Sequence, residues 1–189
     1  MEIVCLDLEG VLVPEIWIEV AERTGVEALR ATTRDVPDYD DLMRQRLAIL
    51  AEHDIGINDI QEAIAAIGPL EGANDFLAWL RQRYQVIILS DTFYEFAEPL
   101  MRQLDWPTLF CHRLVIEDGA VVDYRLRMAD HKRETVKALH CLNFRVIASG
   151  DSYNDTGMLA EADAAFFFRP PPQIIEDFPD FPVADDYAT

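Results

Sequence analysis

Four short apolar runs occur along this chain, and three of them end in polar or acidic residues. The runs span residues 3–8, 86–89, 145–148 and 164–168. They are rich in β-branched or aromatic side chains, and each predicts a strand buried on both faces, as in a parallel sheet. Ligands of open α/β sheets bind beyond the carboxyl ends of such strands. The polar clusters that follow the first three runs are therefore expected to converge on one site.

Apolar residues at helical spacing separate these runs. They precede and follow the run 86–89, and they do so again around the run 145–148. This alternation predicts a doubly wound α/β domain. Residues 14–69 break the alternation, because they contain several helical patterns and no strand-like run. We expect them to form a helical cap inserted after the first strand, which leaves 1–13 and 70–189 as the core.

Two further features of the core follow from local composition. Asp118 and Gly119 stand between two β-rich runs, a pattern typical of a hairpin. The segment that starts at Pro170 is rich in proline and aspartate and stops at Thr189. That composition favours a mobile or truncated tail.

Charge and composition argue against several classes of function. The 189 residues include 16 Lys and Arg against 35 Asp and Glu, a formal net charge of −19. Nucleic acids and anionic membrane surfaces both require basic protein surfaces, so neither is an expected partner. No apolar run approaches the roughly 20 residues of a membrane span, and no basic stretch at the start indicates a signal peptide. The three cysteines are far apart and form no CxxC pair, which favours a cytoplasmic protein.

Four acidic residues are expected at the carboxyl ends of two strands. Asp7 and Glu9 are one residue apart, which places both side chains on one side of an extended segment. Such a pair can bind a hard cation or divide the roles of nucleophile and proton donor, and the alternative is an ordinary solvated strand end. Asp151 ends a strand, whereas Asp155 begins a helix, where aspartate is also an ordinary cap. Four neighbouring acids repel one another, so a bound Mg²⁺ is the simplest explanation.

Two further residues suit a phosphoryl group. Ser90 ends the second strand, and Lys132 stands at a predicted helix start, where its charge opposes the helix dipole. An ordinary surface lysine is the alternative. Together, a hydroxyl, an ammonium and backbone N–H groups would match the equatorial oxygens of a phosphoryl group in transfer.

Arg46 and Glu15 bear on the substrate. Arg46 has Leu42, Met43 and Leu50 as helical neighbours, so it projects from an apolar face. A buried arginine needs an anionic partner, either an acid of the protein or an acidic group of a ligand. Glu15 is either an ordinary acid in the first turn of a helix or the partner of a cationic ligand group.

The order of these features along the chain resembles the haloacid dehalogenase-like phosphatase superfamily. Its four motifs correspond to Asp-Leu-Glu-Gly-Val at 7–11, Leu-Ser-Asp-Thr at 89–92, Lys132, and Gly-Asp-Ser-Tyr-Asn-Asp at 150–155. The resemblance covers the whole chain and implies a Rossmann-like core with a helical cap.

Within that superfamily, the chain most closely resembles the bifunctional phosphoserine phosphatase/homoserine phosphotransferases. Segments 6–15, 90–96 and 150–156 carry this likeness. Glu9 replaces the second aspartate of ordinary phosphoserine phosphatases, and Asp91-Thr92 replaces two glycines after the motif serine. Both departures fit the bifunctional group, in which water is not the only acceptor.

The resemblance also implies a role for each residue of the site. Asp7 would be the nucleophile and Glu9 the general acid and base, and Mg²⁺ would bind the carboxylates of Asp7 and Asp151 and the backbone carbonyl of Glu9. Asp155 would not bind the metal itself but would hold the metal-binding residues in place. The substrate-binding set would comprise a carboxylate clamp at Arg46, an ammonium partner at Glu15, and, around the phosphoryl group, Ser90, Asp91, Lys132 and Asn154.

The resulting hypothesis is a Mg²⁺-dependent enzyme that transfers the phosphoryl group of O-phospho-L-serine to water or homoserine. Three alternatives remain: a phosphatase of another small metabolite such as a sugar phosphate, a phospho-accepting module of the receiver type, and an inactive metal-binding relative. A homodimer is a further expectation. The four histidines show no ligand spacing and are interpreted as structural or surface residues.

Overall fold

The four apolar runs form four adjacent strands of one sheet. The computed structural model describes residues 1–32, 35–36 and 38–188. Its sheet has the order β4-β3-β2-β1-β5-β6-β7. The strands are β1 Glu2–Leu6, β2 Gln85–Phe93, β3 Thr108–Glu117, β4 Ala120–Arg125, β5 Arg145–Gly150, β6 Ala164–Phe168 and β7 Val183–Ala184.

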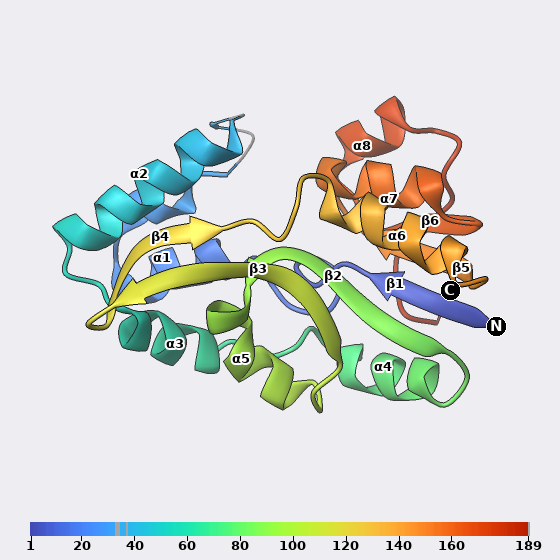
Figure 1. Cartoon of the computed structure of the whole chain (residues 1–189), viewed down its shortest axis with the longest axis horizontal. Coiled ribbons are helices and arrows are strands. Elements are labelled where there is room, and N and C mark those ends of the chain that lie inside the picture. Colours follow the sequence, from blue (N-terminus) through green and yellow to red (C-terminus); the bar gives the residue numbers. More distant parts are fainter. Residues whose placement is uncertain (33–34, 37, 189) are drawn as a thin grey trace.

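Helices cover both faces of this sheet (Figure 1). They are α1 Ile16–Thr24, α2 Tyr39–Glu52, α3 Ile57–Ala65, α4 Ala73–Arg81, α5 Tyr94–Gln103, α6 His131–Cys141, α7 Thr156–Glu161 and α8 Pro172–Asp177, with the short 3-10 helices η1 Glu27–Arg30 and η2 Tyr153–Asp155. In the described part of the chain, none of these helices has the length and apolar character that crossing a membrane requires.

The sheet is doubly wound, as predicted. Strand β1 pairs in parallel with β2 on one side and with β5 on the other. The chain therefore winds outward from β1 in two directions, which creates a switch point at the carboxyl ends of β1, β2 and β5. The pairing of β3 with β4 is antiparallel, which confirms the hairpin expected at residues 118–119.

Alternating residues of β1 enter two apolar layers. Val4 and Leu6 pack in the cluster that α1, α3, α4 and α5 contribute to. Ile3 and Cys5 pack in the cluster formed with α6, α7 and α8. Both faces of the strand are thus buried, which is why its sequence is a nearly continuous apolar run.

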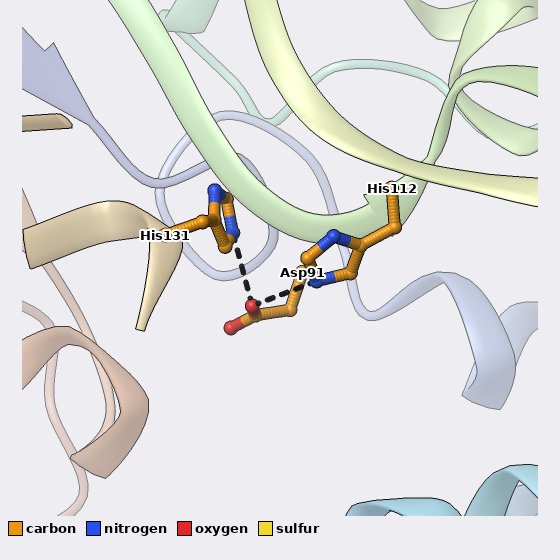
Figure 2. A group of neighbouring side chains, drawn as sticks. All are labelled: Asp91, His112 and His131. Atoms are coloured by element: carbon orange, nitrogen blue, oxygen red, sulfur yellow. Dashed lines mark hydrogen bonds and ion pairs between the residues drawn. The ribbon is translucent and has the colours of Figure 1, made fainter. Parts of the chain in front are cut away.

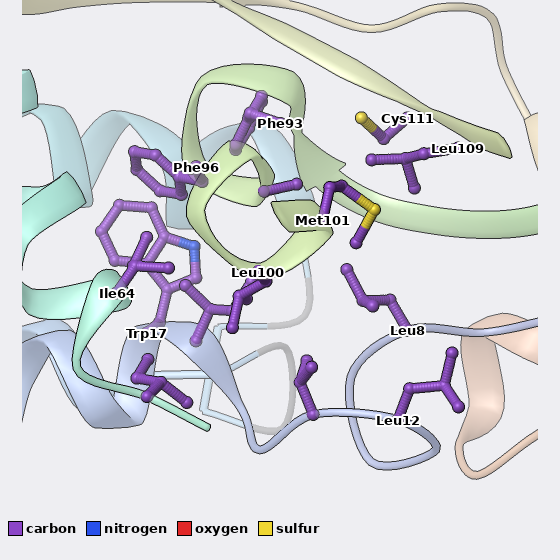
Figure 3. Packing of buried hydrophobic residues seen from close by; sticks show 14 of the residues in the cluster. Leu8, Leu12, Trp17, Ile64, Phe93, Phe96, Leu100, Met101, Leu109 and Cys111 are labelled. Atoms are coloured by element: carbon purple, nitrogen blue, oxygen red, sulfur yellow. The ribbon is translucent and has the colours of Figure 1, made fainter. Parts of the chain in front are cut away.

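The expected helical cap contains α1, α2 and α3, and it also contacts the β3–β4 hairpin. The Ile57 N–H at the start of α3 donates to the Gly119 carbonyl at the hairpin turn (2.9 Å). Trp17 of α1 meets Phe96 of α5 edge to face at 5.0 Å, inside one apolar cluster that continues to Leu8 (Figure 3). The boundaries 1–13, 14–69 and 70–189 remain a prediction.

Strand β2 is longer than its apolar run. It continues through the polar residues to Phe93, and its register against β3 shifts between Leu89 and Phe93. Ser90, Asp91 and Thr92 therefore occupy an irregular stretch of a strand. Irregularities of this kind redirect side chains next to active sites.

The expectation of a mobile tail after Pro170 is wrong. Helix α8 and strand β7 follow, and β7 pairs in parallel with β6. The ring of Tyr187 stacks on those of Phe76 and Phe168, with centroids 4.8 and 4.7 Å apart. Proline and aspartate dominate the local composition, but the aromatic residues between them bury enough apolar surface to order the segment. Thr189 lies outside the described residues.

Candidate active site

The switch point brings most of the predicted site residues to one cavity of about 330 Å³. Asp7 follows β1, Ser90 and Asp91 lie in β2, and Asp151 follows β5. Residues of α1 and α2 line the same cavity. The predicted residues that line this cavity are Asp7, Glu9, Glu15, Arg46, Ser90, Asp91, Asp151 and Asn154.

Asp7 is a buried carboxyl group with one oxygen engaged and one free. The Leu8 N–H donates to its Oδ1 (2.7 Å), and Lys132 Nζ lies 3.0 Å from the same oxygen. Within the part of the chain that the structure describes, no group donates to Asp7 Oδ2. Burial and the neighbouring charge of Asp155 raise the pKa of Asp7 well above its usual range, although Lys132 opposes them. This acid therefore needs cationic partners to stay ionised.

Lys132 and Asp155 form a buried ion pair beside Asp7. Their Nζ and Oδ1 atoms are 2.8 Å apart. Burial favours the neutral amine, but Asp155, Asp7 and Asp91 outweigh it and raise the pKa of Lys132 well above its ordinary value. The lysine is therefore a buried partner of three acids, and its interpretation as a surface residue is wrong.

Asp155 is both a capping residue and an ionic partner. Its Oδ2 accepts the N–H groups of Asp151 (3.0 Å) and Ser152 (3.1 Å), in a capping box at the start of η2. Its Oδ1 faces Lys132. With donors on both oxygens, Asp155 holds the loop and the lysine in place.

Gly10 allows the loop after β1 to approach Asp151 closely. Its φ of +73° suits glycine, and a Cβ there would lie 2.3 Å from Asp151 Oδ2. Oxygens of Asp7, Asp151 and Asp155 lie within 4.8 Å of one another. Burial, then the charges of Asp155 and Glu15, raise the pKa of Asp151 to about 7. Crowded carboxylate oxygens of this kind fit a hard cation, whose charge would offset their repulsion.

Glu9 sits at the amino end of α1. Its Oε2 accepts the Ile16 N–H at 2.8 Å. Burial and the neighbouring Glu15 raise the pKa of Glu9 to about 8, although the Ile16 hydrogen bond, Arg46 and Lys132 act in the opposite direction. A carboxyl group with a pKa near neutrality can both give and accept a proton, as a general acid and base must.

Arg46 is buried in the cavity wall, and no acidic side chain of the described residues pairs with it. Its guanidinium lies over the Trp17 ring at 4.3 Å, and its Nη2 donates to the Ala31 carbonyl (2.8 Å). Its buried Nε has no partner, and among the described residues no carboxylate forms a salt bridge with it. Burial lowers its pKa to about 10, although Tyr39, Glu9 and Glu15 oppose this shift. The internal salt bridge considered from the sequence is therefore absent from the described structure.

Glu15 lies on the same cavity as Arg46 and is exposed. It is the N-cap residue of α1, yet its side chain makes no capping hydrogen bond. Ser90 is buried, and its Oγ accepts the Thr92 N–H at 3.2 Å. The site thus offers a cationic group and an anionic group on the cap side, and hydroxyl and amide groups on the sheet side.

Two histidines belong to this site, although the sequence indicated no special role for them. His131 Nε2 lies 3.1 Å, and His112 Nε2 3.4 Å, from Asp91 Oδ1 (Figure 2). Asn154 Nδ2 donates to the other oxygen, Oδ2, at 2.6 Å, and Lys132 Nζ is 3.5 Å from it. Burial raises the pKa of Asp91, but these four neighbours outweigh it and hold the pKa well below its usual range.

This cluster was missed because its members come from β2, β3 and α6, which are distant in sequence. The position of His131 next to Lys132 is the one local signal that points to it. The other two histidines fit the expectation of surface residues. His53 is exposed, and His140 pairs with the exposed Asp163 at 3.1 Å.

Comparison with known proteins agrees with this geometry. The haloacid dehalogenase-like hydrolase family matches residues 1–163. The chain is 62% identical over 188 residues to the phosphoserine phosphatase ThrH of Pseudomonas aeruginosa, covering 99% of this chain and 92% of the relative. It is 60% identical over 188 residues to a phosphoserine phosphatase of Pseudomonas syringae pv. tomato, covering 99% and 79% of the two chains.

Solved structures show the same fold. A phosphoserine phosphatase in its apo form superposes with a TM-score of 0.79 at 24% identity, over 96% of this chain and 92% of that one. A phospho-aspartyl intermediate analogue of phosphoserine phosphatase gives the same TM-score at 23% identity, with the same coverage. By its sequence match over most of its length, this enzyme belongs to the haloacid dehalogenase-like hydrolase family.

Proposed function

We propose that this enzyme transfers the phosphoryl group of O-phospho-L-serine, through an aspartyl-phosphate on Asp7, to water or to homoserine. The observation that carries the proposal is Arg46, a buried guanidinium in the cavity that Asp7 also lines, with which no acid among residues 1–32, 35–36 and 38–188 pairs. A substrate carboxylate would supply the missing anion through charged hydrogen bonds. The names of the relatives at 62% and 60% identity support the same substrate.

Cavity composition disfavours a sugar phosphate. A sugar offers neither a carboxylate for Arg46 nor an ammonium for Glu15, and both side chains line the cavity. A phosphorylated amino acid pairs with both. Release of phosphate from phosphoserine, compared with release from a sugar phosphate at equal concentration, tests this choice. A higher kcat/KM for the sugar phosphate would contradict it.

In the proposed reaction, Asp7 Oδ2 attacks phosphorus while the bond to the serine oxygen breaks. The attacking oxygen has no donor among the described residues, whereas Oδ1 is fixed by Leu8 and Lys132. Ser90, Lys132 and Asn154 hold the phosphoryl oxygens. Glu9 gives its proton to the departing serine oxygen. In the second step, Glu9 takes a proton from water or homoserine while the oxygen of that acceptor attacks phosphorus, and the bond between phosphorus and Asp7 breaks.

The residues present fit a bound Mg²⁺. Its protein ligands would be the carboxylates of Asp7 and Asp151 and the backbone carbonyl of Glu9, all hard oxygen donors. Asp155 is not a ligand in this proposal, because donors already occupy both of its oxygens. When bound, the ion neutralises charge on the phosphoryl oxygens.

Magnesium is expected to stabilise the fold more at pH 8 than at pH 6. Because the pKa of Asp151 is raised from 3.8 to about 7, ionisation of this group costs the metal-free fold stability as the pH rises from about 4 to about 7, and the full cost remains above pH 7. A cation reverses this cost above pH 7, whereas below it protons compete with the ion. At about 100 times its Kd, a ligand contributes about 2.7 kcal/mol, or roughly 5–10 °C in Tm for a chain of this size.

Thermal unfolding with and without Mg²⁺ at the two pH values measures this effect. The Asp151→Asn variant is expected to lose the increase, and Asp163→Asn, on an exposed aspartate outside the site, is expected to keep it. An unchanged Tm increase in Asp151→Asn would remove Asp151 from the metal site.

Homoserine is expected to compete with water for the aspartyl-phosphate. Arg46 and Glu15 can position the head group of an amino acid acceptor, whereas water gains no such orientation. Adding homoserine to enzyme, Mg²⁺ and phosphoserine should lower the free phosphate formed per serine released, with O-phosphohomoserine as the balance. A ratio of one phosphate per serine at saturating homoserine would show that the enzyme hydrolyses phosphoserine and does not transfer its phosphoryl group to homoserine.

A further inference from the structure

Asp91 was expected among the substrate-binding residues, but both of its oxygens are already occupied. His112 from β3 and His131 from α6 face Oδ1, at 3.4 and 3.1 Å (Figure 2). Asn154 donates to Oδ2 at 2.6 Å, and Lys132 lies 3.5 Å from that oxygen. A bare carboxylate here would repel a phosphoryl group. A carboxylate saturated by donors instead fixes the groups around it.

The hydrogen bonds of His112 determine which way it faces Asp91. Its Nδ1 accepts the Arg127 N–H at 3.1 Å, so the proton of the neutral ring is on Nε2, which points to Asp91. A metal ion at this cluster would need the Nε2 lone pair of His112, which the proton occupies. The ammonium of Lys132 would also repel the metal cation. The geometry therefore favours a hydrogen-bonded clamp over a metal site.

Asn154 is oriented at both ends of its amide. Asp91 Oδ2 accepts one N–H, and the Ser152 hydroxyl donates to Asn154 Oδ1. An amide nitrogen carries two protons, so one N–H remains for a phosphoryl oxygen. Among the described residues, only Asp91 forms a hydrogen bond with the nitrogen of this amide, so Asp91 alone fixes that side of it.

We propose that Asp91, anchored by His112 and His131, is a positioning residue that aims the Asn154 amide at the phosphoryl group. This inference rests on the proposed function, since it assigns the phosphoryl group to Asn154. The proposal assigns different residues to the two ends of the substrate. Asp91 and Asn154 act on the phosphoryl end, whereas Arg46 and Glu15 act on the amino-acid end.

A double-mutant cycle with Asp91→Asn and Asn154→Ala tests the coupling. Each single variant is expected to lower kcat/KM for phosphoserine about 10- to 100-fold, the size for a lost hydrogen bond to a charged group. The double variant is expected to have about the kcat/KM of Asn154→Ala alone, because Asp91 has no amide left to orient once Asn154 is replaced. Asp163→Asn is the matched control: Asp163 pairs with His140 and accepts the Val146 N–H outside the site, an asparagine oxygen can still accept that N–H, and the variant should keep wild-type kinetics.

Inhibition by the two products gives a readout that a general structural defect would not produce. In Asp91→Asn, the Ki of inorganic phosphate should rise about 10-fold or more, while the Ki of L-serine stays within about twofold of wild type. A lower Ki for phosphate in Asp91→Asn would overturn the inference, because Asp91 would then act by charge repulsion. Multiplicative losses in the cycle would also overturn it, as would stoichiometric Zn²⁺ binding by the wild type that Asp91→Asn abolishes.

Failure of the proposed function looks different from failure of this inference. If the wild type released no phosphate from phosphoserine with Mg²⁺, the substrate assignment would fail, and the cycle could be run on p-nitrophenyl phosphate. If the wild type were active on phosphoserine but the two losses multiplied, the inference about Asp91 would fail alone.

Discussion

Replacing Asp7 with asparagine is expected to abolish turnover while the protein stays folded. The amide has nearly the shape of the carboxyl group, but it cannot attack phosphorus as a carboxylate does. Loss of a covalent nucleophile lowers kcat by a factor on the order of 10⁶ in a well-studied hydrolase. Phosphate release from phosphoserine with Mg²⁺ measures the loss.

The fold should tolerate this substitution because the charge of Asp7 is costly in the metal-free protein. Burial and Asp155 raise its pKa well above the usual range, so a neutral amide relieves repulsion. Lys132 loses one partner at 3.0 Å but keeps Asp155 at 2.8 Å. The Tm of Asp7→Asn without Mg²⁺ should therefore equal or exceed that of the wild type. A folded variant that still released phosphate at a substantial rate would exclude Asp7 as the nucleophile.

Replacing Arg46 with alanine is expected to raise KM for phosphoserine far more than KM for a phosphate ester without a carboxylate. A hydrogen bond between charged groups in a closed site contributes roughly 1.5–3 kcal/mol, or about 10- to 150-fold in binding. The ester should be nearly unaffected, because it offers no carboxylate to Arg46 and Arg46 makes no salt bridge among the described residues that its loss would break.

Arg44 provides a matched control on the same helix. It is exposed and pairs with Asp40 at 2.6 Å, so Arg44→Ala should leave both KM values unchanged. Equal increases for the two substrates in Arg46→Ala would make Arg46 a structural residue packed on Trp17. That result would weaken the assignment of a phosphorylated amino acid as substrate.

Local sequence patterns were sufficient for the four central strands and for the polar residues that follow three of them. A strand buried on both faces reads as a nearly continuous apolar run. Asp7 and Asp151 directly follow two such strands, and Ser90 follows the apolar run of a third, so the direction of the chain places all three at the same edge of the sheet. Helical spacing placed Arg46 on a buried face, and the structure confirms that it is buried. These features depend on residues a few positions apart, so one sequence contains them.

The tertiary structure alone decided which distant groups share a hydrogen bond. Asp91, His112 and His131 meet because β2, β3 and the start of α6 converge, and no local period encodes that meeting (Figure 2). The contact of Ile57 with Gly119 and the stacking of Tyr187 on Phe168 likewise join segments far apart in the chain. The sequence thus determined the four central strands and the residue types at the ends of three of them. Three-dimensional packing determined that Asp91 is saturated by donors, because only packing brings charges from separate elements within hydrogen-bonding distance.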